Sequence, residues 1–163
     1  MSEQSITHQL REQIKMHIKN KLDISDLIQN VSLKNEDLSG AVIKYIAKIG
    51  CDLYGCNFSH SILGCEDKIF SLIQCNISNC NFEGCNFVGK AFLRSCVAKG
   101  CNFKNANVAL VDYQHSDFSN SNFCGAIIRI STREGIGAKF PKSMFEDLMK
   151  GWSTKFKIVE EGE

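Results

Sequence analysis

The chain has 163 residues, of which 44% are hydrophobic and 23% are charged, and its formal net charge is +1. This length suits one domain, and the balance of 19 Lys+Arg against 18 Asp+Glu indicates neither a nucleic-acid partner nor an anionic membrane. The nine cysteines are an odd, high count that fits neither a disulfide framework nor ordinary cytosolic usage.

Residues 1–30 are predicted to form a helical cap. Their apolar residues recur every four positions, which is typical of an amphipathic helix: Ile6, Leu10, Ile14, Ile18 and Leu22. The first 20 residues are polar and periodic, and no run of 18 apolar residues occurs, so we expect neither an export signal nor a membrane span.

Residues 31–130 divide into units of five residues. Cysteines mark this period: Cys51 and Cys56; Cys75, Cys80 and Cys85; Cys96 and Cys101. Twenty units fit if one residue is deleted after Gly64 and Lys90 is inserted. The third residue is apolar in 18 of the 20 units, the first is Ala, Cys or Ser in 15, and the second is Asn or Asp in 11.

A period of five matches neither a helix nor a plain strand, and it favours a solenoid. Within each unit we expect the third residue and the small first residue to point inward. The predicted core centres include Leu53, Phe58, Leu72, Phe82, Phe87, Phe103, Phe118 and Phe123. The predicted small inward residues include Cys51, Cys56, Cys65, Cys75, Cys80, Cys85, Cys96 and Cys101, whereas Cys124 falls at an outward position.

Units such as Cys80–Gly84 (CNFEG) and Ala106–Leu110 (ANVAL) resemble the A-(D/N)-L-x-x consensus of pentapeptide-repeat proteins. The resemblance implies an all-β solenoid, namely a right-handed quadrilateral parallel β-helix with one unit per side and about five coils. It would rise by about 4.8 Å per coil.

Units four apart should then stack in columns. One column of centres reads Leu33, Leu53, Leu72, Leu93 and Tyr113. Another forms an aromatic ladder that ends in Phe82, Phe103 and Phe123 after Ile43 and Leu63. Lys48 and Asp67 interrupt a third column on neighbouring coils, where they either pair or both turn outward beside the deletion, and residues 46–69 are the stretch in which the frame is least determined.

Residues 131–163 are predicted to form a loop, a short helix and a tail. Ser143 to Glu146 reads as a capping box, and Gly151 lies near the end of the helix. One side of this helix would carry Met144, Phe145, Leu148, Met149 and Trp152. This face either caps the open end of the solenoid or forms a homodimer or partner site.

No catalytic, cofactor or metal site is predicted. Free cysteines in the inward position are expected to fill the core, because C-x4-C spacing is not that of a zinc knuckle. Cys56, Cys75 and Cys96 would share a column, but parallel side chains in a reducing compartment are poorly placed for a disulfide. The segment from Gly84 to Ala91 resembles a P-loop yet lacks its final hydroxyl and its helix.

Three functions from different classes remain open. The first is a non-enzymatic module, in a bacterial cytoplasm, that binds another protein on its flat sides. The second, implied by the resemblance, is a DNA mimic that binds DNA gyrase and confers resistance to quinolones or toxins, although residues 31–130 balance nine Lys/Arg against eight Asp/Glu. The third is a secreted effector or membrane-associated adaptor, for which the three net positive charges between Arg11 and Lys21 are a weak indication.

Overall fold

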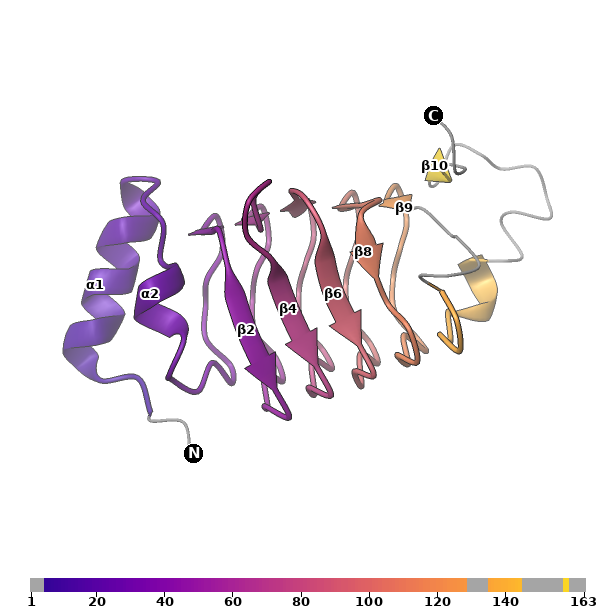
Figure 1. The fold of residues 1–163 in the computed structure, drawn as a ribbon, viewed down its shortest axis with the longest axis horizontal. Coiled ribbons are helices and arrows are strands. Elements are labelled where there is room, and N and C mark those ends of the chain that lie inside the picture. The colour runs from indigo at the N-terminus through magenta and orange to yellow at the C-terminus, as the bar shows by residue number, and fades with distance from the viewer. Residues whose placement is uncertain (1–4, 129–134, 145–156, 159–163) are drawn as a thin grey trace.

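The structure is a computed structural model that describes residues 5–128, 135–144 and 157–158. The chain winds into an elongated parallel β-solenoid, and two helices lie against its N-terminal end (Figure 1). The predicted solenoid is confirmed by a regular series of parallel pairings between successive turns. Among the described residues, no helix is long and apolar enough to cross a membrane.

Helices α1 (His8–Lys19) and α2 (Ser25–Ile28) cover the first turn of the solenoid. Thr7 begins α1 by accepting a hydrogen bond from the backbone N–H of Leu10 at 3.2 Å. Ile14, Ile24 and Ile28 are buried against the core. Leu22, which was assigned to the apolar stripe, follows the end of α1 and is 48% exposed. The open end of the sheet is thereby shielded from solvent and from another chain.

Two parallel sheets form opposite edges of the molecule. One contains the short strands β1 (Val42–Ile43), β3 (Ile62–Leu63), β5 (Asn86–Phe87), β7 (Asn107–Val108), β9 (Ile127–Ile128) and β10 (Lys157–Ile158). The other contains β2 (Ile46–Ile49), β4 (Phe70–Ile73), β6 (Ala91–Arg94) and β8 (Val111–Asp112), of which the first three are the longest strands in the chain. This second sheet is flat and open to view in Figure 1.

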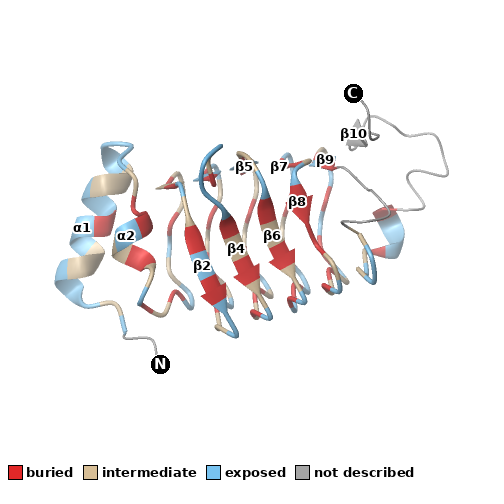
Figure 2. Ribbon diagram, viewed as in Figure 1, coloured by how far each residue is buried: buried red, intermediate tan, exposed pale blue. Residues whose placement is uncertain are grey.

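We name the four sides of the solenoid by their inward centres. Side 1 has Leu33, Leu53, Ile77, Ala98 and Phe118; side 2 has Leu38, Phe58, Phe82, Phe103 and Phe123; side 3 has Ile43, Leu63, Phe87, Val108 and Ile128; side 4 has Lys48, Leu72, Leu93 and Tyr113. Each of these side chains is buried, so the core runs along the axis (Figure 2).

The coil count differs from the prediction because residues 66–69 do not form a unit. The bridged positions Asp37, Asn57, Asn81, Asn102 and Asn122 follow one another at intervals of 20, 24, 21 and 20 residues. The long interval holds a four-residue insertion after Cys65, and Lys90 supplies the extra residue in the next turn. Residues 31–128 therefore make four complete turns and three sides of a fifth, rather than five coils.

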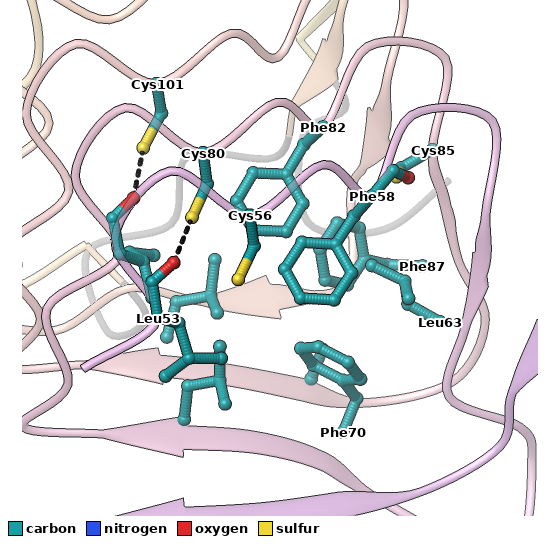
Figure 3. Packing of buried hydrophobic residues seen from close by; sticks show 14 of the residues in the cluster. Leu53, Cys56, Phe58, Leu63, Phe70, Cys80, Phe82, Cys85, Phe87 and Cys101 are labelled. Atoms are coloured by element: carbon teal, nitrogen blue, oxygen red, sulfur yellow. Dashed lines mark hydrogen bonds between the residues drawn. The ribbon is translucent and has the colours of Figure 1, made fainter. Parts of the chain in front are cut away.

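This insertion also corrects the predicted columns. Phe82, Phe103 and Phe123 stack as expected, but the ladder continues to Phe58 rather than to Leu63 (Figure 3). Neighbouring rings lie 4.8–5.2 Å apart and are nearly parallel. Leu53 and Leu72, predicted to share a column, occupy sides 1 and 4.

Lys48 and Asp67 neither pair nor both turn outward. Lys48 occupies an inward centre and is 2% exposed, and its Nζ donates to the carbonyl oxygens of Gln29 and Val31 at 3.2 and 2.9 Å. These backbone acceptors offset the cost of burying an ammonium group. Asp67 is exposed on the insertion.

The corners between sides depend on a left-handed fifth residue. Asn79 and Gly100 hold this position in successive turns, with φ of 57° and 68°. Gly100 lacks the side chain that would collide with its neighbour, since an added Cβ would lie 2.5 Å from Oδ1 of Asn79. Asn79 thus fills the space that glycine leaves in the next turn.

The solenoid extends beyond the units recognised in the sequence. Lys139 bridges to Asp117, and the ring of Phe140 stacks on that of Phe118 at 5.5 Å. Ala138, Lys139 and Phe140 therefore act as one more unit on side 1, at the C-terminal end of the core.

We predict that Phe103→Asp abolishes cooperative folding. Phe103 is buried between Phe82 and Phe123, so an aspartate there would place an unpaired charge inside the ring ladder and cost more than about 4 kcal/mol. Thermal unfolding followed by circular dichroism measures the effect. Ile62→Asp is the matched control, because Ile62 points outward beside Asn86. A cooperative transition near that of wild type in Phe103→Asp would contradict the assigned register.

Candidate functional site: the outer surface of side 4

Side 4 carries the most apolar outward surface of the solenoid. Three rows run along the axis: a corner row of Tyr45, Ile69, Lys90 and Leu110; a middle row of Ala47, Ser71, Phe92 and Asp112; and an outer row of Ile49, Ile73, Arg94 and Gln114. Seven of these 12 residues are apolar or aromatic. We call these 12 residues the side-4 surface. Ile49, Leu110 and Ile69 are 69%, 48% and 47% exposed.

Side 2 shows the opposite character. Its second positions form a polar row of Asp37, Asn57, Asn81, Asn102 and Asn122. Asn57 donates to Asp37 at 3.0 Å, and Asn102 donates to Asn81 at 3.1 Å. Each of these side chains also accepts a hydrogen bond from the backbone N–H two residues later. Their hydrogen bonds are largely used within the solenoid, which makes side 2 a self-contained polar ladder.

The four-residue insertion lies beside the side-4 surface. Cys65 and Lys68 form an antiparallel bridge that closes the loop. The Nζ of Lys68 lies 4.2 Å from the centre of the Tyr45 ring, which ties the loop to the preceding turn. Glu66 and Asp67 are exposed at the tip. The sequence frame missed this loop because Cys65 imitates the first residue of a unit.

Acidic side chains of the solenoid are mostly paired with basic ones. Five of the eight acidic residues between positions 31 and 128 form ion pairs: Glu36 with Arg11, Asp52 with Lys34, Glu83 with Lys104, Asp112 with Arg94, and Asp117 with Lys99. These pairs are distributed over sides 1, 2 and 4. Among the described residues, no side therefore presents a continuous row of unpaired carboxylates.

The cysteines form two inward columns of three and several separate positions. Cys51, Cys75 and Cys96 stack on side 1, and Cys56, Cys80 and Cys101 stack on side 2, which corrects the predicted column of Cys56, Cys75 and Cys96. Cys51 is half-buried, and the other five are buried. Cys85 is buried on side 3. Cys65 lies at the start of the insertion and is half-buried, so its predicted place as a small inward residue was wrong.

Most inward thiols donate to a backbone carbonyl of the preceding turn. Cys80 donates to Leu53 at 3.0 Å and Cys101 to Ile77 at 2.9 Å (Figure 3). Ser121 makes the equivalent bond to Ala98 at 2.8 Å. The thiol thus serves here as a small hydrogen-bond donor that a serine hydroxyl can replace.

Burial holds these thiols in the neutral form. It raises the pKa of Cys85, Cys96 and Cys101 to about 12 and also raises that of Cys75. The pKa of Cys80 is raised by its hydrogen bond with the Cys56 thiol and by burial. Such thiols are poor nucleophiles and poor metal ligands at neutral pH. Within the described ranges, no three His, Cys, Asp or Glu side chains are grouped so as to hold a metal ion.

Other candidate sites have structural explanations. Asn86 and Phe87, inside the P-loop-like segment, belong to strand β5. His60 and His115 occupy left-handed corner positions. A cavity of about 420 Å³ near the C-terminal end is lined by Ser119, Asn120, Ser121, Phe140, Pro141, Lys142 and Ser143, a lining without a carboxylate, thiol or imidazole.

The predicted C-terminal face is only partly described. Met144 is buried, so its side chain packs inward rather than toward a partner. Phe145, Leu148, Met149 and Trp152 lie outside the described residues.

Comparison with known proteins agrees with the repeat geometry. Residues 75–112 match the family model of pentapeptide repeats in eight copies. The chain is a pentapeptide-repeat protein. The resemblance found in the sequence is thus confirmed, and the repeat pairing reaches beyond the matched residues to both ends of the described solenoid.

Several solved structures are similar at low identity. Rfr23, a pentapeptide repeat protein from the cyanobacterium Cyanothece 51142, is 20% identical over 70% of this chain and 63% of its own, with a TM-score of 0.31. A pentapeptide repeat protein from the thylakoid lumen of Arabidopsis thaliana is 17% identical over 66% of this chain and 59% of its own, with a TM-score of 0.27. This chain therefore spans less than two thirds of either protein.

A third similar structure is full-length QnrB1, described as a plasmid-mediated fluoroquinolone resistance protein. It is 19% identical over 76% of this chain and 88% of its own, with a TM-score of 0.26. No curated protein matches the chain.

We predict that alkaline pH destabilises the protein through its buried thiols. The unfolded thiols titrate near pH 9, whereas Cys85, Cys96 and Cys101 retain their protons in the fold up to about pH 12. Stability is therefore full below pH 9 and falls above it, by about 1.4 kcal/mol per pH unit for each thiol. Urea unfolding at several values between pH 7.5 and 10.5 measures the slope.

A triple variant provides the control for this prediction. Cys85→Ala, Cys96→Ser and Cys101→Ser together remove the three titrating groups, so the alkaline slope should become distinctly shallower. An unchanged slope in the folded triple variant would show that other groups cause the alkaline loss.

Proposed function

We propose that this chain is a non-catalytic scaffold that binds another protein through its side-4 surface. The observation that carries the proposal is the concentration of exposed apolar residues there, at seven of 12 outward positions. The second and fourth positions of side 2 contain only Cys124 from the same hydrophobic set. A contiguous exposed apolar area of this kind is typical of a protein-binding surface.

The flat shape of side 4 supports the same role. Strands β2, β4 and β6 each have four residues, and they pair in register without a bulge. Their inward residues are held by the packed core, so the outward residues sit on a rigid support. A rigid surface loses little conformational entropy on binding.

The charge distribution favours this scaffold over a DNA mimic. A mimic of duplex DNA needs unpaired acid that competes with phosphates. Here five of the eight acidic residues between positions 31 and 128 form ion pairs with lysine or arginine. A gyrase supercoiling assay tests mimicry directly, and inhibition at micromolar protein would support it against the scaffold.

The first helix gives little support to a membrane adaptor. Its apolar residues Leu10, Ile14 and Ile18 pack against the solenoid core, so they are not free to enter a lipid surface. Arg11, one of its positive charges, forms a bidentate pair with Glu36 at 2.6 and 3.2 Å.

We predict that a photo-reactive residue on side 4 captures a specific partner. Benzoylphenylalanine in place of Ile49 should yield a discrete cross-linked protein in lysate of the native host, identified by mass spectrometry. The same residue in place of Val97, which is 47% exposed on side 1, is the matched control.

The competing variant in this experiment is Ile73→Lys. Because Ile73 pairs with Ile49 in the outer row and points outward, a lysine there should reduce the Ile49 cross-link at least tenfold without altering the melting temperature. Equal cross-linking from positions 49 and 97, or none from position 49, would contradict the proposed surface.

A further inference from the structure

We infer that the segment bound by the side-4 surface is an amphipathic α-helix with a basic flank, supplied by the partner protein. This inference rests on the proposed function and adds the class of element that the surface accepts. It follows from three features of side 4: its size, the state of its backbone and the position of its carboxylates.

The size of the surface favours one helix over a globular domain or a second copy of this chain. A strand of four residues spans about 13 Å, and four strands at about 4.8 Å spacing span about 14 Å, which gives roughly 200 Å². A stable interface buries about 800 Å² per partner, so side 4 alone is too small for a lasting homodimer. Its width matches the 10–12 Å diameter of a helix.

The backbone of side 4 excludes an added strand. The main-chain groups of β2, β4 and β6 are used in the parallel ladders that join successive turns. They point along the solenoid axis and not outward, so an extended segment on this face would find no backbone partners. A helix satisfies its own backbone hydrogen bonds and needs only side-chain contacts from the surface.

The apolar rows fit the spacing of a helix that lies along the axis. Successive turns of the solenoid repeat at about 4.8 Å, and successive turns of a helix at 5.4 Å. Over β2 and β4, large side chains flank a small one: Ala47 lies between Tyr45 and Ile49, and Ser71 lies between Ile69 and Ile73. A ridge of apolar residues at i, i+3/i+4 and i+7 can rest over this small middle row. Phe92 then ends the row of small residues.

The insertion supplies charge complementarity at one edge. Glu66 and Asp67 are exposed beside Ile69, and the Lys68 ammonium is directed at the Tyr45 ring. On the side-4 surface itself, the charges of Arg94 and Asp112 pair with each other. The carboxylates of the loop therefore favour lysine or arginine on the flank of the helix that faces the insertion.

Selection from two peptide libraries tests the inference. Both libraries hold 18-residue peptides of the same composition, one with apolar residues at helical spacing and the other with strict alternation. We expect enrichment on the full chain from the helical library alone, with basic residues on one flank, and a gain of helical circular dichroism on binding. Enrichment of alternating peptides, or of neither library, would overturn the inference.

Variants locate the bound peptide on the surface. Binding of the best helical peptide should weaken at least tenfold in Ile73→Lys and about threefold to fivefold in Glu66→Gln/Asp67→Asn, with the latter effect reduced at 0.5 M salt. Val97→Lys on side 1 is the matched control and should leave the affinity unchanged. Equal loss in all three variants, or loss in none, would place the peptide elsewhere and overturn the inference.

The cross-linking experiment separates the two proposals. If position 49 captures a partner while helical peptides fail, or if the captured segment is extended, side 4 remains the binding surface and the helix is wrong. If position 49 captures nothing, the scaffold surface itself is wrong.

Discussion

The backbone ladder between successive turns is the constraint on which the rest of the structure depends. The N–H of Phe58 donates to Asn81, that of Phe82 to Asn102 and that of Phe103 to Asn122, each at 2.7 Å. Because the same atoms bond in every turn, each turn must follow the path of the one before it. Side chains at equivalent positions are then stacked at the spacing of paired strands. A change of chain length can be accommodated only where the path leaves the ladder, and both insertions in the described turns lie at the corner between sides 3 and 4.

Stacking at this spacing selects the side chains. Inward first positions admit only small groups, and a group that can also donate to the turn below adds a bond between turns. Cysteine and serine both meet this requirement, as Cys101 and Ser121 show in successive turns of side 2. The high cysteine count therefore has a structural cause in this fold. It does not require the redox or metal chemistry that nine cysteines would otherwise suggest.

The period, the inward centres and the solenoid could be predicted from the sequence because each depends on local spacing. The insertion could not, since both a deletion after Gly64 and a loop after Cys65 restore the period. Only continuity between turns distinguishes them: the loop aligns Phe58 with Phe82 and Asn57 with Asn81, whereas the deletion does not. Lys48 was also misjudged, because its acceptors are backbone carbonyls of residues 29 and 31, which carry no side-chain signal. The side-4 surface was missed for the same reason, since its rows exist only when the turns are correctly aligned.

The apolar character of side 4 is not a requirement of the fold. On side 2 the second residue must turn the chain, so it is Asn or Asp and accepts the N–H two residues later. On side 4 the strands continue through this position, and Ala47, Ser71 and Phe92 occupy it without making such a turn. Polar residues would serve equally well there, as Asp112 does in the next turn by bonding to Gln114 at 3.2 Å. Exposed isoleucine in the adjoining outer row brings an aggregation hazard and no gain in core packing. A binding role for this surface explains why it is apolar where the fold would accept polar side chains.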